Sequence, residues 1–148
     1  MSVRNASCLC GSIKVEMRGD PYSSNLCHCS SCQKNSASVF GWFAVYGTEQ
    51  VTITESEPSV LANYKDASPE SGEILTRSFC GKCGSSVSSQ PKSNTDILVV
   101  PVGIVDGDKT SFNPESEFYC KRRADWVPAI EDTKTFESMP PKPAPVTN

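Results

Sequence analysis

Apolar residues recur mostly at every second position along this chain. Ile13, Val15 and Met17 alternate with polar residues and run into the turn 19–21, which is typical of a half-buried strand followed by a breaker. Segments rich in turn residues separate five further strand candidates. These candidates are 39–45, 51–54, 73–79, 85–89 and 97–102. The pattern predicts a mainly β domain with brief helices at 30–36 and 121–126.

The length of the chain predicts one domain. A chain of 148 residues can bury a core without disulfides. Near the C-terminus, four prolines fall within residues 140–145, and such a composition favours an extended or flexible tail. We therefore expect a folded domain over residues 1–136 and a flexible, proline-rich tail over residues 137–148.

The charge and hydropathy of the chain limit the classes of partner that it can bind and the cellular compartment in which we expect it. A net charge of −3 argues against a nucleic-acid partner, because phosphate binding needs a basic face. No apolar span approaches the length of a membrane helix, and the first seven residues contain no apolar stretch typical of a signal peptide. We expect a cytoplasmic protein that binds neither nucleic acid nor a membrane.

Seven of the eight cysteines fall into three tight groups. Seven thiols exceed the needs of one tetrahedral zinc, whereas a closed site with four ligands and an open site with three account for all of them. The first and third groups both end in Cys-Gly, and glycine allows the tight turn that aims backbone N–H groups at a ligating sulfur. The first and third groups predict a structural zinc site made of Cys8, Cys10, Cys80 and Cys83.

The middle group predicts the open zinc site. Cys27, Cys29 and Cys32 can reach a single ion from one short loop, with no fourth partner nearby. Other interpretations stay open for this group: a redox pair of Cys29 and Cys32, disulfides, or a second structural zinc completed by His28 or Cys120. A zinc that carries three thiolates has a net charge of −1, so it favours a thiolate as fourth ligand over the activation of water. The natural substrate is then a small thiol together with the electrophile that it adds to.

The three motifs together resemble a known family. Cys8-Leu9-Cys10-Gly11, the Cys-His-Cys-Ser-Ser-Cys stretch 27–32 and the stretch 77–84 with Cys-Gly-Lys-Cys-Gly are similar to those of glutathione-dependent formaldehyde-activating enzymes and the related centromere protein V domain. The resemblance covers roughly residues 5–127. It implies several short coiled antiparallel sheets, as in methionine sulfoxide reductase B, pinned by a structural four-cysteine zinc. It also implies two zinc ions per chain.

The resemblance implies an activity as well: a carbon–sulfur lyase that joins formaldehyde to glutathione as S-hydroxymethylglutathione or releases it. Glutathione would be the small-molecule partner, and a homo-oligomer is compatible with this picture. By motif, Cys8, Cys10, Cys80 and Cys83 match the structural ligands, and Cys27, Cys29 and Cys32 match the catalytic ones. The residue after the third thiolate is often arginine in the family, and here it is Gln33, followed by Lys34.

Some residues outside the cysteine sets are candidates for substrate contacts. Lys34 and Arg77 could bind a carboxylate of the thiol substrate. His28, the single histidine, is expected to be a structural or solvent-facing imidazole more readily than a general base. We expect the three cations at 121–123 to steer an anionic thiol or to face solvent. Trp42, Phe43 and Trp126 are expected in the core, and Cys120 is expected to be a small buried residue.

Three function classes follow from these features. The first is a zinc-dependent carbon–sulfur lyase. The second is a non-catalytic, zinc-stabilised binding module, and the third is a redox or metal-buffer protein. An exchangeable open zinc site separates the first class from the second, and the zinc content separates both from the third.

Overall fold

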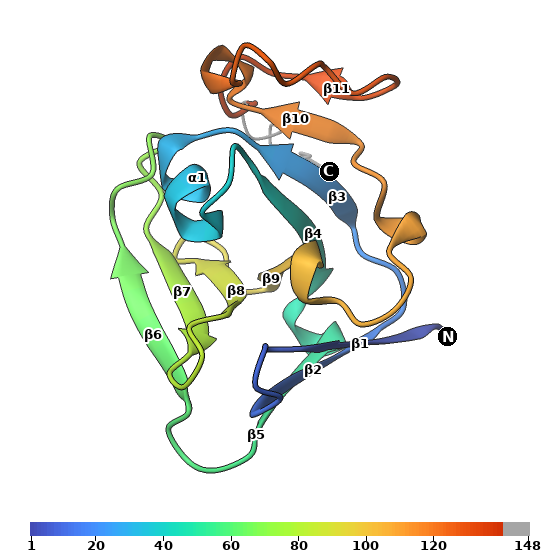
Figure 1. The fold of residues 1–148 in the computed structure, drawn as a ribbon, viewed down its shortest axis with the longest axis vertical. Coiled ribbons are helices and arrows are strands. Elements are labelled where there is room, and N and C mark those ends of the chain that lie inside the picture. Colours follow the sequence, from blue (N-terminus) through green and yellow to red (C-terminus); the bar gives the residue numbers. More distant parts are fainter. Residues whose placement is uncertain (141–148) are drawn as a thin grey trace, which may run out of the picture.

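Two β-sheets form the framework of the computed structural model, which describes residues 1–140 (Figure 1). A three-stranded sheet has the order β1-β2-β5, with β1 (Val3–Ser7), β2 (Ile13–Arg18) and β5 (Val51–Glu55). An eight-stranded sheet has the order β11-β10-β3-β4-β9-β8-β7-β6. Its strands are β3 (Ser23–Cys27), β4 (Gly41–Gly47), β6 (Leu61–Asp66), β7 (Leu75–Cys80), β8 (Ser86–Pro91), β9 (Ile97–Pro101), β10 (Ser116–Phe118) and β11 (Lys134–Thr135).

The larger sheet is strongly curled, and the helix α1 (Ser30–Ser36) lies between β4 and the β7–β8 pair (Figure 1). Four single 3-10 turns connect other strands, at Thr48–Gln50, Val102–Ile104, Thr110–Phe112 and Cys120–Arg122. The pairings are antiparallel except that β10 runs parallel to both β3 and β11. This architecture confirms the predicted mainly β fold class. No helix among residues 1–140 has the length and apolar character needed to cross a bilayer.

The main core lies between the two sheets. Ile13, Val15 and Met17 are buried there, as their alternation predicts, and they pack with Tyr46 of β4 and with Phe112. Successive side chains of a strand point to opposite faces, so β4 also contributes to a second cluster on the other side of the large sheet. In this second cluster Phe43 packs against Cys27, Cys29, Cys32 and Tyr119.

The hydrophobic pattern does not predict five strands of the structure. β1, β3, β6, β10 and β11 carry too many polar residues to alternate, and they are strands because their backbones pair with neighbours. β3 is the clearest case. Ser24 is buried in it, and its hydroxyl is satisfied by donating to the carbonyl of Phe112 at 2.7 Å.

The expected helix over residues 121–126 is wrong. The chain makes a single 3-10 turn at Cys120–Arg122 and then a separate turn in which the N–H of Val127 donates to the carbonyl of Ala124 at 2.9 Å. Tyr119 enters this region in a left-handed conformation, with φ of 57°. Pro128 disfavours a helical conformation of the residue before it. Trp126, expected in the core, is 76% exposed.

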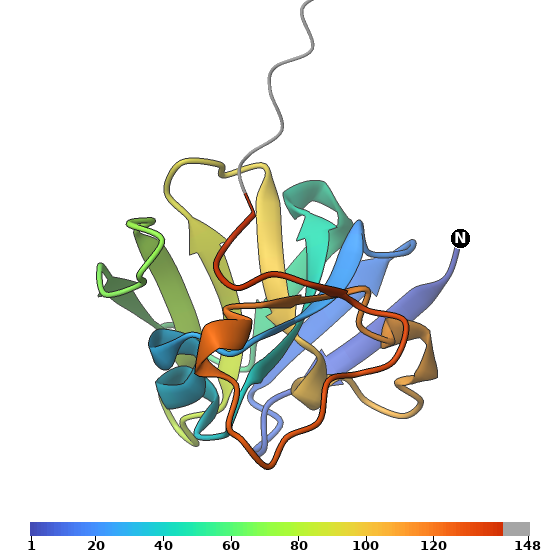
Figure 2. The same cartoon turned by 90° about the horizontal axis from the view of Figure 1, so that it is seen from above.

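The C-terminal segment crosses the surface beside β10 (Figure 2). Phe136 packs against Phe118 with ring centroids 5.8 Å apart and the rings tilted by 38°, and its carbonyl accepts from the N–H of Cys120 at 2.9 Å. The first residues of the expected tail, 137–140, continue from this docked segment. The rest of that tail, 141–148, lies outside the described residues.

Candidate metal centres and active site

The four cysteines of the first and third motifs meet in one cluster. Cys8 and Cys10 lie in the loop between β1 and β2, whereas Cys80 ends β7 and Cys83 lies in the turn between β7 and β8. The Sγ atoms of Cys8 and Cys10 are 3.6 Å apart, and those of Cys10 and Cys80 are 3.7 Å apart. A tetrahedral zinc with Zn–S bonds of about 2.3 Å places its sulfurs about 3.8 Å apart. The spacing therefore fits a closed four-thiolate metal site.

The backbone around this cluster is built to support thiolates. Gly11 and Gly84, each directly after a cysteine, have φ of +76° and +75°, a conformation that other residues adopt only with strain. The N–H of Ile13 donates to Cys8 Sγ at 3.2 Å. A hydrogen bond with Ser85 is the main reason that the pKa of Cys83 is lowered to about 5. Because the two loops belong to different sheets, a metal here would tie the sheets together.

Cys27, Cys29 and Cys32 form a second, separate cluster. Cys27 ends β3, Cys29 caps the start of α1 and Cys32 lies in its first turn, so a strand end and a helix start bring their sulfurs within 4.8 Å of one another. All three are buried. Among residues 1–140, no fourth cysteine, histidine or carboxylate joins this group. The cluster is suited to a metal that keeps one position for an outside ligand.

The three sulfurs influence one another strongly. Hydrogen bonds from Cys27 and Cys32 lower the pKa of Cys29 to about 2, and hydrogen bonding to Cys29 raises the pKa of Cys27 far above its usual value. The N–H of Cys32 also donates to Cys29 Sγ at 3.3 Å. One thiolate thus suppresses the ionisation of its neighbour. Three thiolates at this spacing need a cation between them, which is what a metal supplies.

The helix start at Cys29 bears on the redox interpretation of the middle motif. A Cys-x-x-Cys pair at the start of a helix is typical of thiol oxidoreductases. Here, however, β3 and β4 on either side of α1 are antiparallel, not the parallel strands of a βαβ unit. Cys27 adds a third sulfur to the pair. The arrangement is closer to a metal site than to a redox pair.

Arg77 does not face solvent. It lies on β7 with 6% of its surface exposed, and its Nε donates to the Asp66 carboxylate at 2.7 Å. Its other nitrogens donate to Ser89 at 3.3 Å and to Ser31 at 3.0 Å. The guanidinium is therefore engaged inside the protein, and the expected contact with a substrate carboxylate would require breaking this buried pair.

Lys34, in contrast, is exposed on α1. It lines a hollow of about 650 Å³ together with Ser30, Gln33 and the exposed Trp126. Ser30 directly follows Cys29, so this hollow adjoins the three-cysteine loop. The side-chain amide of Gln33 donates to the His28 carbonyl at 2.9 Å and thereby braces the same loop.

The other cations near the site are paired. Lys121 and Arg122 bind Glu70 at 2.6 Å and 3.1 Å, and Arg123 binds Glu117 at 2.9 Å. Lys121 and Arg122 face solvent, as one of the two expectations for residues 121–123 has it, and all three cations are held in ion pairs. Within residues 1–140, no ion pair involves Lys34.

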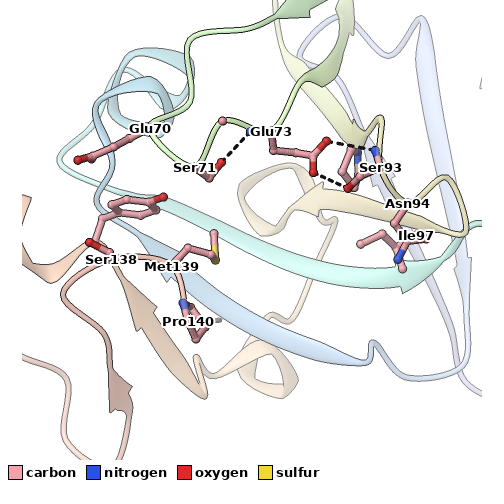
Figure 3. A pocket seen from close by; sticks show the side chains of 12 residues that line it. Glu70, Ser71, Glu73, Ser93, Asn94, Ile97, Ser138, Met139 and Pro140 are labelled. Atoms are coloured by element: carbon pink, nitrogen blue, oxygen red, sulfur yellow. Dashed lines mark hydrogen bonds between the residues drawn. The ribbon is translucent and has the colours of Figure 1, made fainter. Parts of the chain in front are cut away.

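A larger hollow of about 1210 Å³ lies beside Tyr119. Glu70, Glu73, Met139 and Pro140 line it, and Glu73 hydrogen-bonds with its neighbour in the lining, Ser93 (Figure 3). Tyr119 also lines this hollow and packs against the three cysteines, so it forms the wall between them. None of the described lining residues is a lysine or an arginine.

Glu117 is the functional candidate that sequence reasoning missed. It is 1% exposed, and its carboxylate accepts from His28 Nε2, Arg123 Nη2, the Ile130 N–H and the Thr133 hydroxyl at 2.9 to 3.1 Å. His28 is fully buried, which agrees with a structural imidazole and contradicts a solvent-facing one. Cys120 lies close to His28 and Glu117, but the Arg123 guanidinium, 3.3 Å from Cys120 Sγ, already supplies the cation there. The group is an internal brace between the cysteine loop and residues 123–133, not a third metal site.

We expect Glu117→Gln to destabilise the fold by about 3–5 kcal/mol at pH 7, because the change leaves buried hydrogen-bond donors and Arg123 without their anion. Burial raises the pKa of Glu117, but hydrogen bonds from Ile130, Arg123 and His28 outweigh it and lower the pKa from 4.5 to about 2. The folded-state pKa lies below the unfolded one. The carboxylate therefore stabilises the fold above pH 4.5, and about 3 kcal/mol is lost as the pH falls towards 2.

Urea unfolding at a series of pH values measures both effects. The matched control is Glu115→Gln, which removes an exposed carboxylate two residues away. The control should unfold like the wild type, and Glu117→Gln should flatten the acid limb of the stability profile. Equal stability of the two variants at pH 7 would refute the role of Glu117 as a brace.

Comparison with known proteins agrees with the motifs and the fold. The model of the glutathione-dependent formaldehyde-activating enzyme family matches residues 3–122. A solved structure of a Rhodobacter sphaeroides protein is similar in fold, with a TM-score of 0.55 and 20% sequence identity, over 72% of this chain and 91% of that chain. The family match spans most of the chain and contains both cysteine clusters. The chain therefore belongs to the glutathione-dependent formaldehyde-activating enzyme family.

Proposed function

We propose that this protein is a zinc-dependent carbon–sulfur lyase. Its substrates would be glutathione, or a similar small thiol, and thioadducts such as S-hydroxymethylglutathione. The observation that carries the proposal is the buried cluster of three sulfurs within 4.8 Å that has no fourth protein ligand among the described residues. A site of this kind reserves a position for an incoming ligand. Membership in the family supplies glutathione and formaldehyde as the chemical class.

The proposal assigns two zinc ions. Cys8, Cys10, Cys80 and Cys83 would hold a structural zinc, since their sulfur spacing matches a closed tetrahedron. Cys27, Cys29 and Cys32 would hold a catalytic zinc, which when bound keeps a small thiol in the nucleophilic thiolate form. In the synthetic direction a bond forms between the thiol sulfur and the carbonyl carbon, and the thiol proton ends on the new hydroxyl group. The reverse reaction breaks that carbon–sulfur bond.

The chain's own residues bind the substrate and shield the site. Tyr119 and Phe43 cover the three sulfurs and limit access of water to them. Lys34 is the candidate for a substrate carboxylate, because it is exposed beside the cysteine loop and has no ion pair in the described chain. The large hollow fits an anionic thiol less well, since its described lining has no cation to offer. Arg77 is occupied by Asp66 and is not proposed as a substrate ligand.

We expect the zinc-loaded protein to accelerate the exchange of formaldehyde between its free form and its glutathione adduct. NMR exchange spectroscopy on the two reactants measures this rate with and without enzyme. Lys34→Ala should weaken the binding of glutathione by about 1–3 kcal/mol, because the lysine would make a charge-assisted bond to a substrate carboxylate. Lys65→Ala, at an exposed lysine of β6 that lines neither hollow, is the control and should bind glutathione like the wild type.

Unchanged exchange rates would exclude formaldehyde as the electrophile. If other thioadducts were also untouched and glutathione did not reach the metal, the alternative of a non-catalytic, zinc-stabilised binding module would replace the enzyme.

A further inference from the structure

A chain of polar contacts runs from a buried ion pair to one of the three clustered cysteines. Asp66 at the end of β6 accepts from Arg77 Nε at 2.7 Å, and Arg77 Nη2 donates to Ser31 Oγ at 3.0 Å. Ser31 Oγ in turn lies 3.7 Å from Cys29 Sγ, within hydrogen-bonding distance for sulfur. These contacts join three separate parts of the sequence at the metal-binding loop.

The direction of these hydrogen bonds follows from the chemistry of the groups. A guanidinium has donors and no acceptor, so the Ser31 oxygen must accept from Arg77. The hydroxyl hydrogen of Ser31 is then free to point at Cys29 Sγ. Cys29 Sγ already accepts from the N–H of Cys32 at 3.3 Å, which gives it two donors.

Stability alone is a poor reason for this arrangement. Asp66 and Arg77 are 4% and 6% exposed, and a buried ion pair is often no more stabilising than apolar residues of similar size. Burying the pair is better explained by what Arg77 reaches, a residue 46 positions away in the cysteine loop. Arg77 also lies three residues before Cys80, so β7 connects the four-cysteine cluster to the three-cysteine loop.

Resting on the proposed three-cysteine zinc site, we propose that Asp66 and Arg77 position Ser31 as a hydrogen-bond donor that tunes the catalytic zinc through Cys29. A thiolate that accepts a hydrogen bond gives less negative charge to its metal. A zinc with three thiolates carries a net charge of −1, and this donor offsets part of that charge. Arg77, Asp66 and Ser31 are positioning residues, and none of them touches the substrate.

Cobalt(II) in the open site reports on this hydrogen bond directly. Exchange of the more labile ion in the zinc-loaded protein should place cobalt at the three cysteines, and Cys32→Ser should remove most of the sulfur-to-cobalt charge-transfer absorption. Ser31→Ala removes the donor, which raises the energy of the sulfur electrons, so this absorption should move to longer wavelength. Ser31→Thr keeps a hydroxyl and should restore the wild-type position. Ser30→Ala, at the exposed neighbour, is the matched control and should show no change.

Arg77→Lys tests the other contacts of this series, because lysine keeps the charge but loses the forked guanidinium that reaches both Asp66 and Ser31. We expect the same shift of the absorption and a loss of about 10–100-fold in metal affinity at the open site, measured by competition with a chelator. Identical spectra of the wild type and Ser31→Ala would overturn the inference while the metal site stands. If the charge-transfer absorption of the wild type did not depend on Cys32, the three-cysteine site itself would be overturned, and with it both proposals.

Discussion

We expect Cys8→Ser to prevent folding of the domain. Cys8 is buried and lies in the loop of the three-stranded sheet, while its partner Cys80 ends β7 of the large sheet and Cys83 lies in the turn that follows. A structural zinc contributes on the order of 10 kcal/mol to small metal-dependent folds. That contribution is comparable with the whole stability of a typical domain, about 5–15 kcal/mol. Circular dichroism and the zinc content of the purified protein measure the result.

The eighth cysteine supplies the control for this experiment. Cys120 belongs to neither sulfur cluster, so Cys120→Ser should fold and bind as much zinc as the wild type. If Cys8→Ser melted cooperatively near the wild-type temperature, the four-cysteine cluster would not be a structural zinc site.

Cys29→Ser should abolish the proposed activity while the fold survives. Cys29 is the N-cap of α1, where its sulfur accepts from the N–H of Cys32, and serine is a preferred residue at this position. The change should therefore cost at most about 1 kcal/mol, or about 4 °C in the melting temperature. The loop would keep two of its three thiolates, which are too few to hold the open site's metal firmly.

Thermal unfolding, zinc content and formaldehyde exchange together check this result. The expected variant melts near the wild type, holds one zinc ion per chain and shows only the uncatalysed exchange rate. If Cys29→Ser were the unstable protein and Cys8→Ser the stable one, the assignment of the closed and open sites would be reversed.

Much of the fold was accessible from local pattern. Alternation located β2 and β5 nearly to the residue, and the short helix at 30–36 appears with the bounds that its sequence predicts. Strands without an apolar face, such as β3 and β10, could not be found in this way, because neighbouring backbones rather than side chains hold them in place. The expected helix at 121–126 does not form, because Tyr119 enters this segment in a left-handed conformation and Pro128 disfavours a helical conformation of the residue before it.

The sequence by itself determined which sulfurs can meet a metal. Ligand spacing and the glycine after Cys10 and Cys83 are local properties, and they separate a set of four cysteines from a set of three without any knowledge of the fold. Tertiary structure decided how the charges around them are used. Arg77 reads as a free cation in the sequence, yet the pairing of β6 with β7 places Asp66 against it. Glu117 reads as an ordinary carboxylate, yet the parallel pairing of β10 with β3 buries it against His28. The role of a charged side chain depends on its partners. Asp66 is 11 residues from Arg77 and His28 is 89 residues from Glu117 in the sequence, so only folding brings each pair together.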